Sequence, residues 1–302
     1  MAPGLQPLSL EGGPVDDDIP SQPLTYRILS AERLAPTVTR LVVAAPLVAR
    51  KHQAGHFVIV RTGPEGERVP LTIVEADRER GTITLIVQGV GKSTKAIVAL
   101  EAGGALADVL GPLGNPTPIG NHGEVACVGG GVGVAELLPI ARALGAAGNT
   151  VHAIVGGRTR ELVILEQEMA SCALSLVITT DDGTYGRKGI VTDVLRELIA
   201  RRPIGAVYAI GPLPMMKAVA EVTRPASIPT IASLNAIMVD GTGMCGGCRV
   251  LVAGEMKFAC VDGPEFDAHG VDFDELIRRN GAYRDLERLS DERACHGVRE
   301  PA

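Results

Sequence analysis

Short apolar segments recur through the first part of the chain, at residues 39–43, 57–61, 71–74 and 82–87. They are rich in β-branched side chains, and turns that contain proline and glycine separate them. One helix is predicted from residue 93 to about residue 100. Short strands at regular spacing are typical of a small antiparallel barrel. We therefore predict a β barrel over residues 24–120.

After residue 121 the pattern changes, and apolar strands alternate with helical stretches. The predicted strands are 124–128, 152–155, 176–179 and 207–210, and the helices that follow them are 134–147, 162–170, 190–201 and 214–222. This alternation favours a parallel sheet with helices on both faces, so we assign residues 121–223 to an α/β domain. The remaining residues, 224–302, contain short strands, a group of cysteines and a helical stretch at 273–279. They are predicted to form a third, small domain.

Composition excludes some classes of protein. The 302 residues are 46% hydrophobic and carry a net charge of −6, which argues against a nucleic-acid binder with a basic face. The longest apolar run, 125–144, is interrupted by Glu136, Pro139 and Arg142, so no membrane span is expected. Residues 1–23 are acidic and rich in proline and glycine, which predicts a disordered leader without a secretory signal. We expect a cytoplasmic protein.

Two glycine loops at predicted strand ends point to a nucleotide. Gly130, Gly131 and Gly133 follow one strand and open a helix, where backbone N–H groups and the helix N-terminus suit a pyrophosphate. Gly211, Pro212 and Met215 follow the last strand and belong to the same edge of a parallel sheet. A tight turn without a ligand is the alternative for the first loop, and a plain helix start for the second.

The barrel carries two further candidates for cofactor binding. The RVPLT segment supplies Arg68, which can grip a phosphate, then Pro70, Leu71 and Thr72, whose hydroxyl can hydrogen-bond a flavin edge. A surface arginine and an ordinary strand threonine are the alternative. A glycine loop at a helix start suits a second phosphate, and its residues are Gly91, Lys92, Ser93 and Thr94. Its spacing differs from that of a P-loop.

A cysteine cluster is the strongest local signal, with the pattern Asp240-x4-Cys245-x2-Cys248-x11-Cys260. It keeps the plant-type spacing for a [2Fe–2S] cluster, with Asp240 in the first ligand position. Three thiolates and one carboxylate supply the four ligands required. Two alternatives are a structural zinc site and a bystander Asp240 with His269 completing the site. Outside the cluster, Cys127 and Cys172 are predicted to be buried, and Cys295 to be an exposed thiol in the tail.

At this point the motifs resemble a known family, from about residue 24 to 288. The stretches are RVPLTI, GPLGNP, VGGGVG, TDDGTYGRKGIVTDVL, GPLPMMKAV, DGTGMCGGCRV and FACVDGPEFDAHGVDFDEL. They are similar to the electron-transfer subunits of the dihydroorotate dehydrogenase and sulfide dehydrogenase type. The likeness is greatest to the small subunit of NADH-dependent ferredoxin:NADP oxidoreductase, a branch that shares the aspartate at position 240.

The resemblance implies a ferredoxin-reductase-like fold with FAD, NAD(H) and a [2Fe–2S] cluster. It also implies a larger, glutamate-synthase-like flavin and iron–sulfur partner, and electron bifurcation that involves ferredoxin and NADP. Hydride would pass from NADH to the flavin, and single electrons would then leave through the cluster. Arg158 and Arg160 suit a 2′-phosphate, whereas Asp181 and Asp182 oppose one, and the resemblance favours NAD.

The cofactors would carry this chemistry, so no catalytic side chain is required, and the sequence suggests no Ser/His/Asp arrangement. Two other functions remain open. One is a free-standing NAD(P)H:ferredoxin reductase with the same cofactors. The other, from a different class, is a non-catalytic binding protein with structural zinc.

Overall fold

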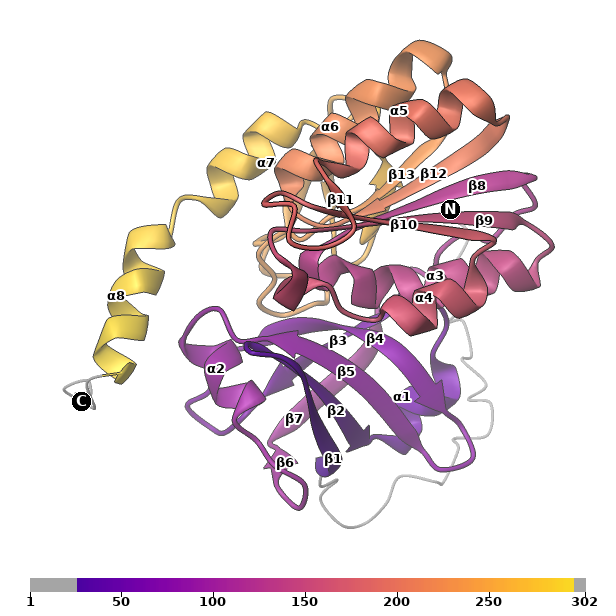
Figure 1. Cartoon of the computed structure of the whole chain (residues 1–302). Helices are drawn as coiled ribbons and strands as arrows, with labels where there is room; N and C mark the ends of the chain where they lie inside the picture. The colour runs from indigo at the N-terminus through magenta and orange to yellow at the C-terminus, as the bar shows by residue number, and fades with distance from the viewer. Residues whose placement is uncertain (1–25, 296–302) are drawn as a thin grey trace, which may run out of the picture.

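Seven antiparallel strands form the first sheet of the computed structural model, which describes residues 26–295 (Figure 1). The predicted leader, residues 1–23, lies outside the described part of the chain. The strands are β1 (Tyr26–Ala35), β2 (Val38–Ala44), β3 (Phe57–Arg61), β4 (Val69–Asp77), β5 (Thr82–Gln88), β6 (Ala105–Leu106) and β7 (Asp108–Leu113). Their order is β6-β1-β2-β5-β4-β3-β7. Because only Ala107 separates β6 from β7, the two ends of the sheet meet and the barrel nearly closes.

Cross-strand pairs of apolar side chains fill the barrel. Leu41 lies opposite Leu85, and Val43 lies opposite Ile83, and all four side chains are fully buried. Residues two apart in a strand point to the same face, so alternation places these side chains inward. Two short helices, α1 (Pro46–Lys51) and α2 (Lys92–Val98), flank the barrel. The predicted barrel is confirmed.

The second sheet is parallel, as predicted, apart from one edge strand. Its order is β11-β10-β9-β8-β12-β13-β16, and only β16 runs antiparallel. The strands are β8 (Glu124–Gly130), β9 (Thr150–Gly157), β10 (Ser175–Thr180), β11 (Arg187–Lys188), β12 (Ile204–Ile210), β13 (Thr230–Ser233) and β16 (Glu265–Asp267). The chain extends from β8 to β10 in one direction and then places β12 and β13 on the other side of β8. In open α/β sheets such a reversal marks the ligand-binding edge.

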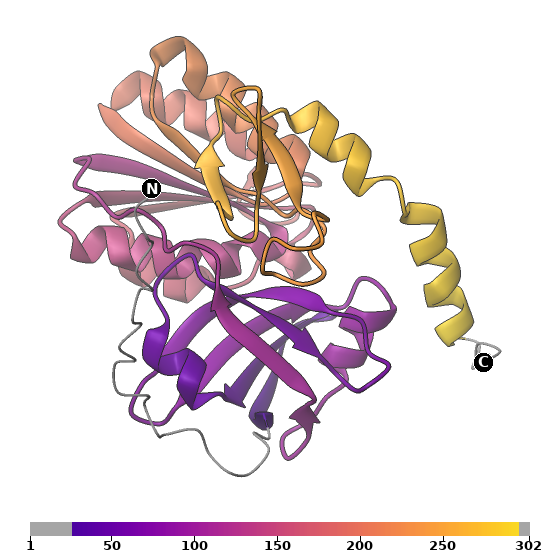
Figure 2. The same ribbon diagram turned by 180° about the vertical axis from the view of Figure 1, so that it is seen from behind.

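Helices cover both faces of this sheet (Figures 1 and 2). On the face toward the barrel lie α3 (Val134–Ala146) and α4 (Glu166–Cys172). On the opposite face lie α5 (Val191–Arg201) and α6 (Leu213–Thr223). The predicted helix at 162–170 begins later than expected, because 160–162 form a 3₁₀ turn and Leu165 has a φ of 58°. Cys127 is buried as predicted, whereas Cys172 is only partly buried.

The C-terminal part is not a fully separate unit. Two strands from the described part of residues 224–302 belong to the parallel sheet: β13 pairs with β12, and β16 pairs with β13. A 3₁₀ turn (Arg224–Ala226) precedes them, and β14 (Arg249–Val252) and β15 (Glu255–Phe258) form a hairpin. The predicted boundary at 224 therefore falls before a strand of the same sheet, and the cysteine-containing segment, residues 234–264, begins only after β13 ends at Ser233.

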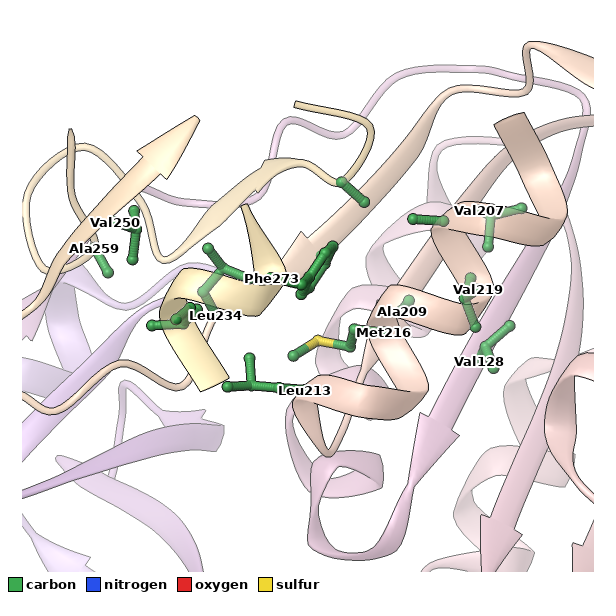
Figure 3. Packing of buried hydrophobic residues seen from close by; sticks show 14 of the residues in the cluster. Val128, Val207, Ala209, Leu213, Met216, Val219, Leu234, Val250, Ala259 and Phe273 are labelled. Carbon is green, nitrogen blue, oxygen red and sulfur yellow. The ribbon is translucent and has the colours of Figure 1, made fainter. Parts of the chain in front are cut away.

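One apolar core joins the cysteine-containing segment to the parallel sheet (Figure 3). Met216 on α6 packs in the same cluster as Leu234, Val250 and Phe273, and all four are buried. Phe273 opens α7 (Phe273–Asn280), whose N-terminus is capped by Asp272 accepting from the Glu275 N–H at 2.9 Å. This shared core fixes the segment relative to the sheet.

A final helix, α8 (Arg284–Cys295), was not among the predicted elements. It projects along the barrel side and lies beside α2 (Figure 1). Lys95 Nζ donates to Asp291 Oδ2 at 2.6 Å across this contact. Cys295, predicted to lie in a tail, is therefore the last residue of a helix. No helix in the described region 26–295 has both the length and the apolar character needed to cross a membrane.

Leu137→Ala tests the core between the barrel and the sheet, where Leu137 of α3 is fully buried. We expect the free energy of unfolding to fall by about 2–5 kcal/mol, because the deletion leaves a cavity in a packed core. Urea denaturation measures the change. Leu174→Ala is the control, since Leu174 is 70% exposed, and its effect should stay within about 0.5 kcal/mol.

Candidate functional site

A cleft of about 960 Å³ opens where the barrel, the parallel sheet and residues 233–238 meet. It lies at the carboxyl ends of β8 and β12, at the point where the strand order reverses. Many of the predicted cofactor-binding residues line it: Pro70, Leu71, Thr72, Gly130, Gly131, Gly133, Gly211, Pro212 and Met215. The fold thus brings together the RVPLT segment and both glycine loops.

The two glycine loops pack closely against each other, and the glycines of the first loop leave no room for a side chain at two positions. A Cβ on Gly133 would lie 2.6 Å from the Ile210 carbonyl oxygen, and one on Gly130 would lie 2.5 Å from Met215 Sδ. Gly131 is different, because its φ is +55° and a Cβ there would meet nothing within 4 Å. Packing therefore explains Gly130 and Gly133, whereas Gly131 leaves open space at the start of α3. That space fits a phosphate beside a helix N-terminus.

The barrel side of the cleft is formed by Thr72, Leu71 and Phe57, which lies opposite Thr72 across β3 and β4. Arg68 does not reach this cleft. It lines a separate hollow of about 270 Å³, together with Arg61 and other residues of β3 and β7. Arg68 precedes β4 and is four residues from Thr72, a distance of about 13 Å along an extended strand, so sequence proximity did not place Arg68 and Thr72 together.

The second predicted phosphate loop also lies outside the cleft lining. Thr94 Oγ1 accepts from the N–H groups of Val90 at 2.9 Å and Gly91 at 3.1 Å, which caps α2. The Ser93 hydroxyl donates to the Glu67 carboxylate. These hydroxyls are thus already used within the protein. Binding of a phosphate by Gly91, Lys92, Ser93 and Thr94 stays a prediction, and it requires Ser93 to change partner.

At the far end of the cleft, Arg158 and Asp181 face the space, but Asp182 does not. Asp182 accepts from the Thr184 N–H at 2.9 Å and the Thr184 hydroxyl at 2.7 Å, and these bonds lower the pKa of its carboxyl. Arg160 lies over the ring of Tyr185, 4.7 Å from its centroid. Arg158 and Asp181 therefore line this end of the cleft, whereas binding of a cofactor by Asp182 stays a prediction.

Three predicted ligands, Asp240, Cys245 and Cys248, lie in the loop at residues 239–248, called here the cysteine-containing loop, and Cys260 follows β15. Cys248 Sγ and Cys260 Sγ are buried and 3.2 Å apart, whereas Cys245 is exposed. Asp240 accepts from the Thr242 N–H at 2.9 Å and the Cys245 N–H at 2.6 Å. These hydrogen bonds, that of Thr242 foremost, lower the pKa of its carboxyl, which keeps it anionic as a ligand must be.

The loop needs its glycines. Gly241, Gly243 and Gly246 have φ values of 75°, 84° and 66°, which other residues adopt only with strain. Within residues 26–295, no three His, Cys, Asp or Glu side chains stand together as ligands of one metal ion. A [2Fe–2S] cluster spreads its ligands over two irons. His269, the alternative ligand, is hydrogen-bonded through Nε2 to Thr223 Oγ1 at 2.9 Å and is thereby held against α6.

Comparison with known proteins identifies the family. Residues 235–272 match the iron–sulfur cluster binding domain of dihydroorotate dehydrogenase B. A Thermotoga maritima protein described as a dihydroorotate dehydrogenase B (NAD(+)) electron transfer subunit homolog is 44% identical over 266 residues, which are 88% of this chain and 94% of that protein. The chain belongs to this family of electron transfer subunits.

Other relatives agree. The Geobacillus thermodenitrificans dihydroorotate dehydrogenase B electron transfer subunit is 34% identical over 253 residues, 81% of this chain and 96% of that protein. A chain from the structure of NADH-dependent reduced ferredoxin-NADP oxidoreductase, solved to study flavin-based electron bifurcation, is 42% identical, with a TM-score of 0.86 over 91% of this chain and 99% of that chain. Phthalate dioxygenase reductase, at 19% identity and a TM-score of 0.55, shares the fold.

This electron transfer subunit also contains a hydrogen-bonded Ser–His–Glu chain, which the sequence did not suggest. His152 Nδ1 lies 2.7 Å from Ser175 Oγ, and His152 Nε2 lies 2.9 Å from Glu124 Oε2. Glu124 and Ser175 begin β8 and β10, at the amino edge of the sheet, so the chain lies at the end opposite the cleft. It ties three neighbouring strands together, and its members are too far apart in sequence to form a motif.

Two further acidic residues beside the cleft were missed in the same way. Glu136 lines the cleft, and the Ser233 hydroxyl donates to its Oε1. Glu265 accepts from Thr117 Oγ1 at 2.7 Å, and burial, opposed by that bond and helped by Glu136, raises its pKa to about 8. Burial likewise raises the pKa of Glu136. Of these two residues, only Glu136 could have been suspected from the sequence, because it lies in the first turn of the helix that follows the glycine loop.

Gly133→Ala tests the contact between the two loops. Its Cβ would meet backbone atoms of Ile210 and Gly211 within 3 Å, so the loops must separate. We expect loss of stability by about 1–3 kcal/mol and weaker nucleotide binding, measured by denaturation and by fluorescence titration with NADH. Gly145→Ala in α3 is the matched control, because its nearest neighbour lies 3.8 Å away. Equal NADH affinity in both variants would contradict this account.

Because burial raises the pKa of Glu265, we expect the free energy of unfolding to depend on pH. The folded pKa of this carboxyl, about 8, lies above the usual glutamate value of 4.5, so its contribution to stability is fully present below pH about 4.5 and is lost as the pH rises through 8. The wild type should lose roughly 4 kcal/mol more than Glu265→Gln across this window. Urea denaturation at pH 5, 7 and 9 measures the slopes. Parallel slopes would show that Glu265 titrates normally.

Proposed function

We propose that this chain is the smaller subunit of a heterodimeric oxidoreductase that exchanges hydride with NAD(H) at an FAD and passes electrons through a [2Fe–2S] cluster to a larger partner. One observation carries the proposal. Phe57 of β3 lines the cleft, and Ile59 on the same strand lies against the cysteine-containing loop, 2.7 Å from a Cβ position on Gly241. Two residues of a strand span about 7 Å. The cleft and the loop therefore share one barrel wall.

The cleft fits the cofactors of this reaction. The open backbone at Gly131 and the N-terminus of α3 would hold a pyrophosphate, and Gly211 and Pro212 would border the nucleotide from β12. Thr72 offers a hydroxyl to a flavin edge, beside the apolar surfaces of Pro70 and Leu71. When bound, the flavin supplies the exchange between two-electron hydride transfer and one-electron transfer. The residues of the chain would bind the flavin and the nucleotide, orient them and shield them from water.

We infer NAD(H) rather than NADP(H) as the preferred nucleotide. Asp181 faces the cleft beside Arg158, and a carboxylate there would repel a 2′-phosphate. The neighbouring Arg160 is stacked on Tyr185, whose hydroxyl donates to Glu166 at 2.9 Å. That arginine is thus less available to neutralise an additional phosphate. The NAD(+) in the names of the family relatives is consistent with this preference.

The cluster would be held by Asp240, Cys245, Cys248 and Cys260. The loop around it exposes apolar side chains to solvent: Met244 is 88% exposed, Val239 52% and Val261 41%. Such a surface beside a redox loop suits a partner that must approach closely to accept electrons. We propose a larger, glutamate-synthase-like flavin and iron–sulfur subunit here, with ferredoxin as a further reaction partner and bifurcation taking place on the larger subunit. A cytoplasmic location stays a prediction.

Cofactor analysis with Cys248→Ser tests the assignment. Wild-type protein should show flavin absorption and about two irons per chain. The variant should retain the flavin and its bleaching by NADH, but lose the iron and electron delivery to the partner. Cys172→Ser is the control, since Cys172 lies on α4, and it should keep both cofactors.

Two outcomes would decide against parts of this function. Zinc without flavin in the wild-type protein would favour the non-catalytic zinc-binding alternative. A protein that carries both cofactors, purifies without a larger subunit from its native source and reduces ferredoxin alone would be the free-standing reductase.

A further inference from the structure

A line of polar side chains leads from the cleft into the protein. Thr72 of β4 and Ser233 of β13 both hydrogen-bond the carboxyl of Glu136, and these three residues line the cleft. Ser233 lies directly opposite Glu265 in the pairing of β13 with β16. Glu265 Oε1 accepts from Thr117 at 2.7 Å. Residues of the barrel, the parallel sheet and the C-terminal part thus meet at two carboxyl groups.

The surroundings of the two carboxyls favour their protonated forms. Glu265 Oε2 is buried and has no hydrogen-bond partner in the described structure. Burial has the largest effect on the Glu265 carboxyl, and the charge of Glu136 adds to it. Tyr208 lies close enough to Glu265 for the charge of that carboxyl to act on it. The groups that act on Glu136 are the hydroxyls of Ser233 and Thr72. Two adjacent carboxyls in such a place do not both ionise readily, so the pair retains a proton.

Of the residues that line the cleft, only Glu136, Arg158 and Asp181 have side chains that ionise. Arg158 follows β9, and Asp181 follows β10, the strands farther from the barrel. Glu136 is the one that hydrogen-bonds a barrel residue, Thr72. On the barrel side of the cleft, Glu136 is therefore the one ionisable lining residue that could exchange a proton.

The proposed function creates a need for such a group. Oxidation of NADH to NAD⁺ delivers a hydride, which is two electrons and one proton. If the two electrons leave singly through the iron–sulfur cluster to a one-electron acceptor, one proton stays behind in the cleft. For each NADH, the balance is NAD⁺, two electrons on the acceptor and one proton on a base.

We propose that Glu136 accepts this proton and that Glu265, the carboxyl beside it, favours the protonated form, so that the pair is the proton reservoir of the cleft. In the reverse direction the same carboxyl donates the proton. The O–H bond on the Glu136 carboxylate would form as the bond that holds the proton on the reduced flavin breaks and the second electron leaves. Thr72 is a positioning residue, because its hydroxyl holds the carboxyl against the barrel wall. This inference rests on the proposed function.

Glu136→Gln in the full-length, flavin-loaded protein tests the proposal by infrared spectroscopy. The reduced-minus-oxidised difference spectrum of the wild type should contain the C=O band of a protonated carboxyl. That band should vanish in Glu136→Gln, shift in Glu265→Gln and persist in the exposed control Glu101→Gln. A spectrum without the band, or one in which it survives in Glu136→Gln, overturns the proposal.

Stopped-flow kinetics provide a second readout. Bleaching of the flavin by NADH, measured on the same Glu136→Gln sample, gives the reference rate against which electron exit is compared. Electron transfer to ferricyanide through the cluster should slow by about 10²-fold, the usual contribution of a positioned acid or base. The rate of electron transfer to ferricyanide should also depend less on pH in Glu136→Gln than in the wild type. Equal electron-exit rates at every pH would overturn the proposal, whereas absence of flavin or of bleaching in the wild type would overturn the proposed function instead.

Thr72→Val and Ser233→Ala keep the proposal testable if Glu136→Gln does not fold. Each removes one hydroxyl partner of Glu136 and leaves the carboxyl in place. We expect the infrared band to shift in both variants, and electron exit to slow in Ser233→Ala because the Glu136 carboxyl loses the hydroxyl that donates to it. An unshifted band in both variants would overturn the assignment to Glu136.

Discussion

The close approach of two backbone loops at the carboxyl ends of β8 and β12 is the constraint on which the site depends. Gly133 lies so near the Ile210 carbonyl that even one methyl group would force the loops apart. This contact sets the mouth of the cleft and directs the N-terminus of α3 into it. Since α3 also packs on the barrel through β4, the same helix fixes the distance between the two walls that a flavin and a nicotinamide would share.

A second constraint joins the cleft to the cysteine-containing loop. The loop rests on Ile59 and Leu113, and the positive φ of Gly241 lets its backbone lie against them. The apolar core that includes Met216 and Phe273 fixes the same segment from the other side (Figure 3). An electron carrier needs fixed distances more than it needs a reactive side chain. Packing on two sides of this segment therefore sets where its cysteines lie relative to the barrel wall.

The polar groups at the junction of the three parts have a different physical character. Burying carboxyls between packed elements is unfavourable unless they are hydrogen-bonded or neutral, and here they are both hydrogen-bonded and disposed to hold protons. Their position beside the cleft connects protonation to the redox chemistry proposed there. The Ser175–His152–Glu124 chain, at the opposite edge of the sheet, uses the same residue types as a cross-strand tie.

The order of elements, the barrel, the parallel sheet, both glycine loops and the cysteine spacing were readable from the sequence, because each depends on local periodicity or on residues close together in the chain. The tertiary structure alone decided that Arg68 lies outside the cleft that Thr72 lines, that Ser93 is bonded to Glu67, and that Asp181 rather than Asp182 lines the cleft. It also brought Glu136 and Glu265 together from distant strands and helices. Contacts of this kind depend on how elements stack and in which register they pair, and no local pattern of residues encodes that.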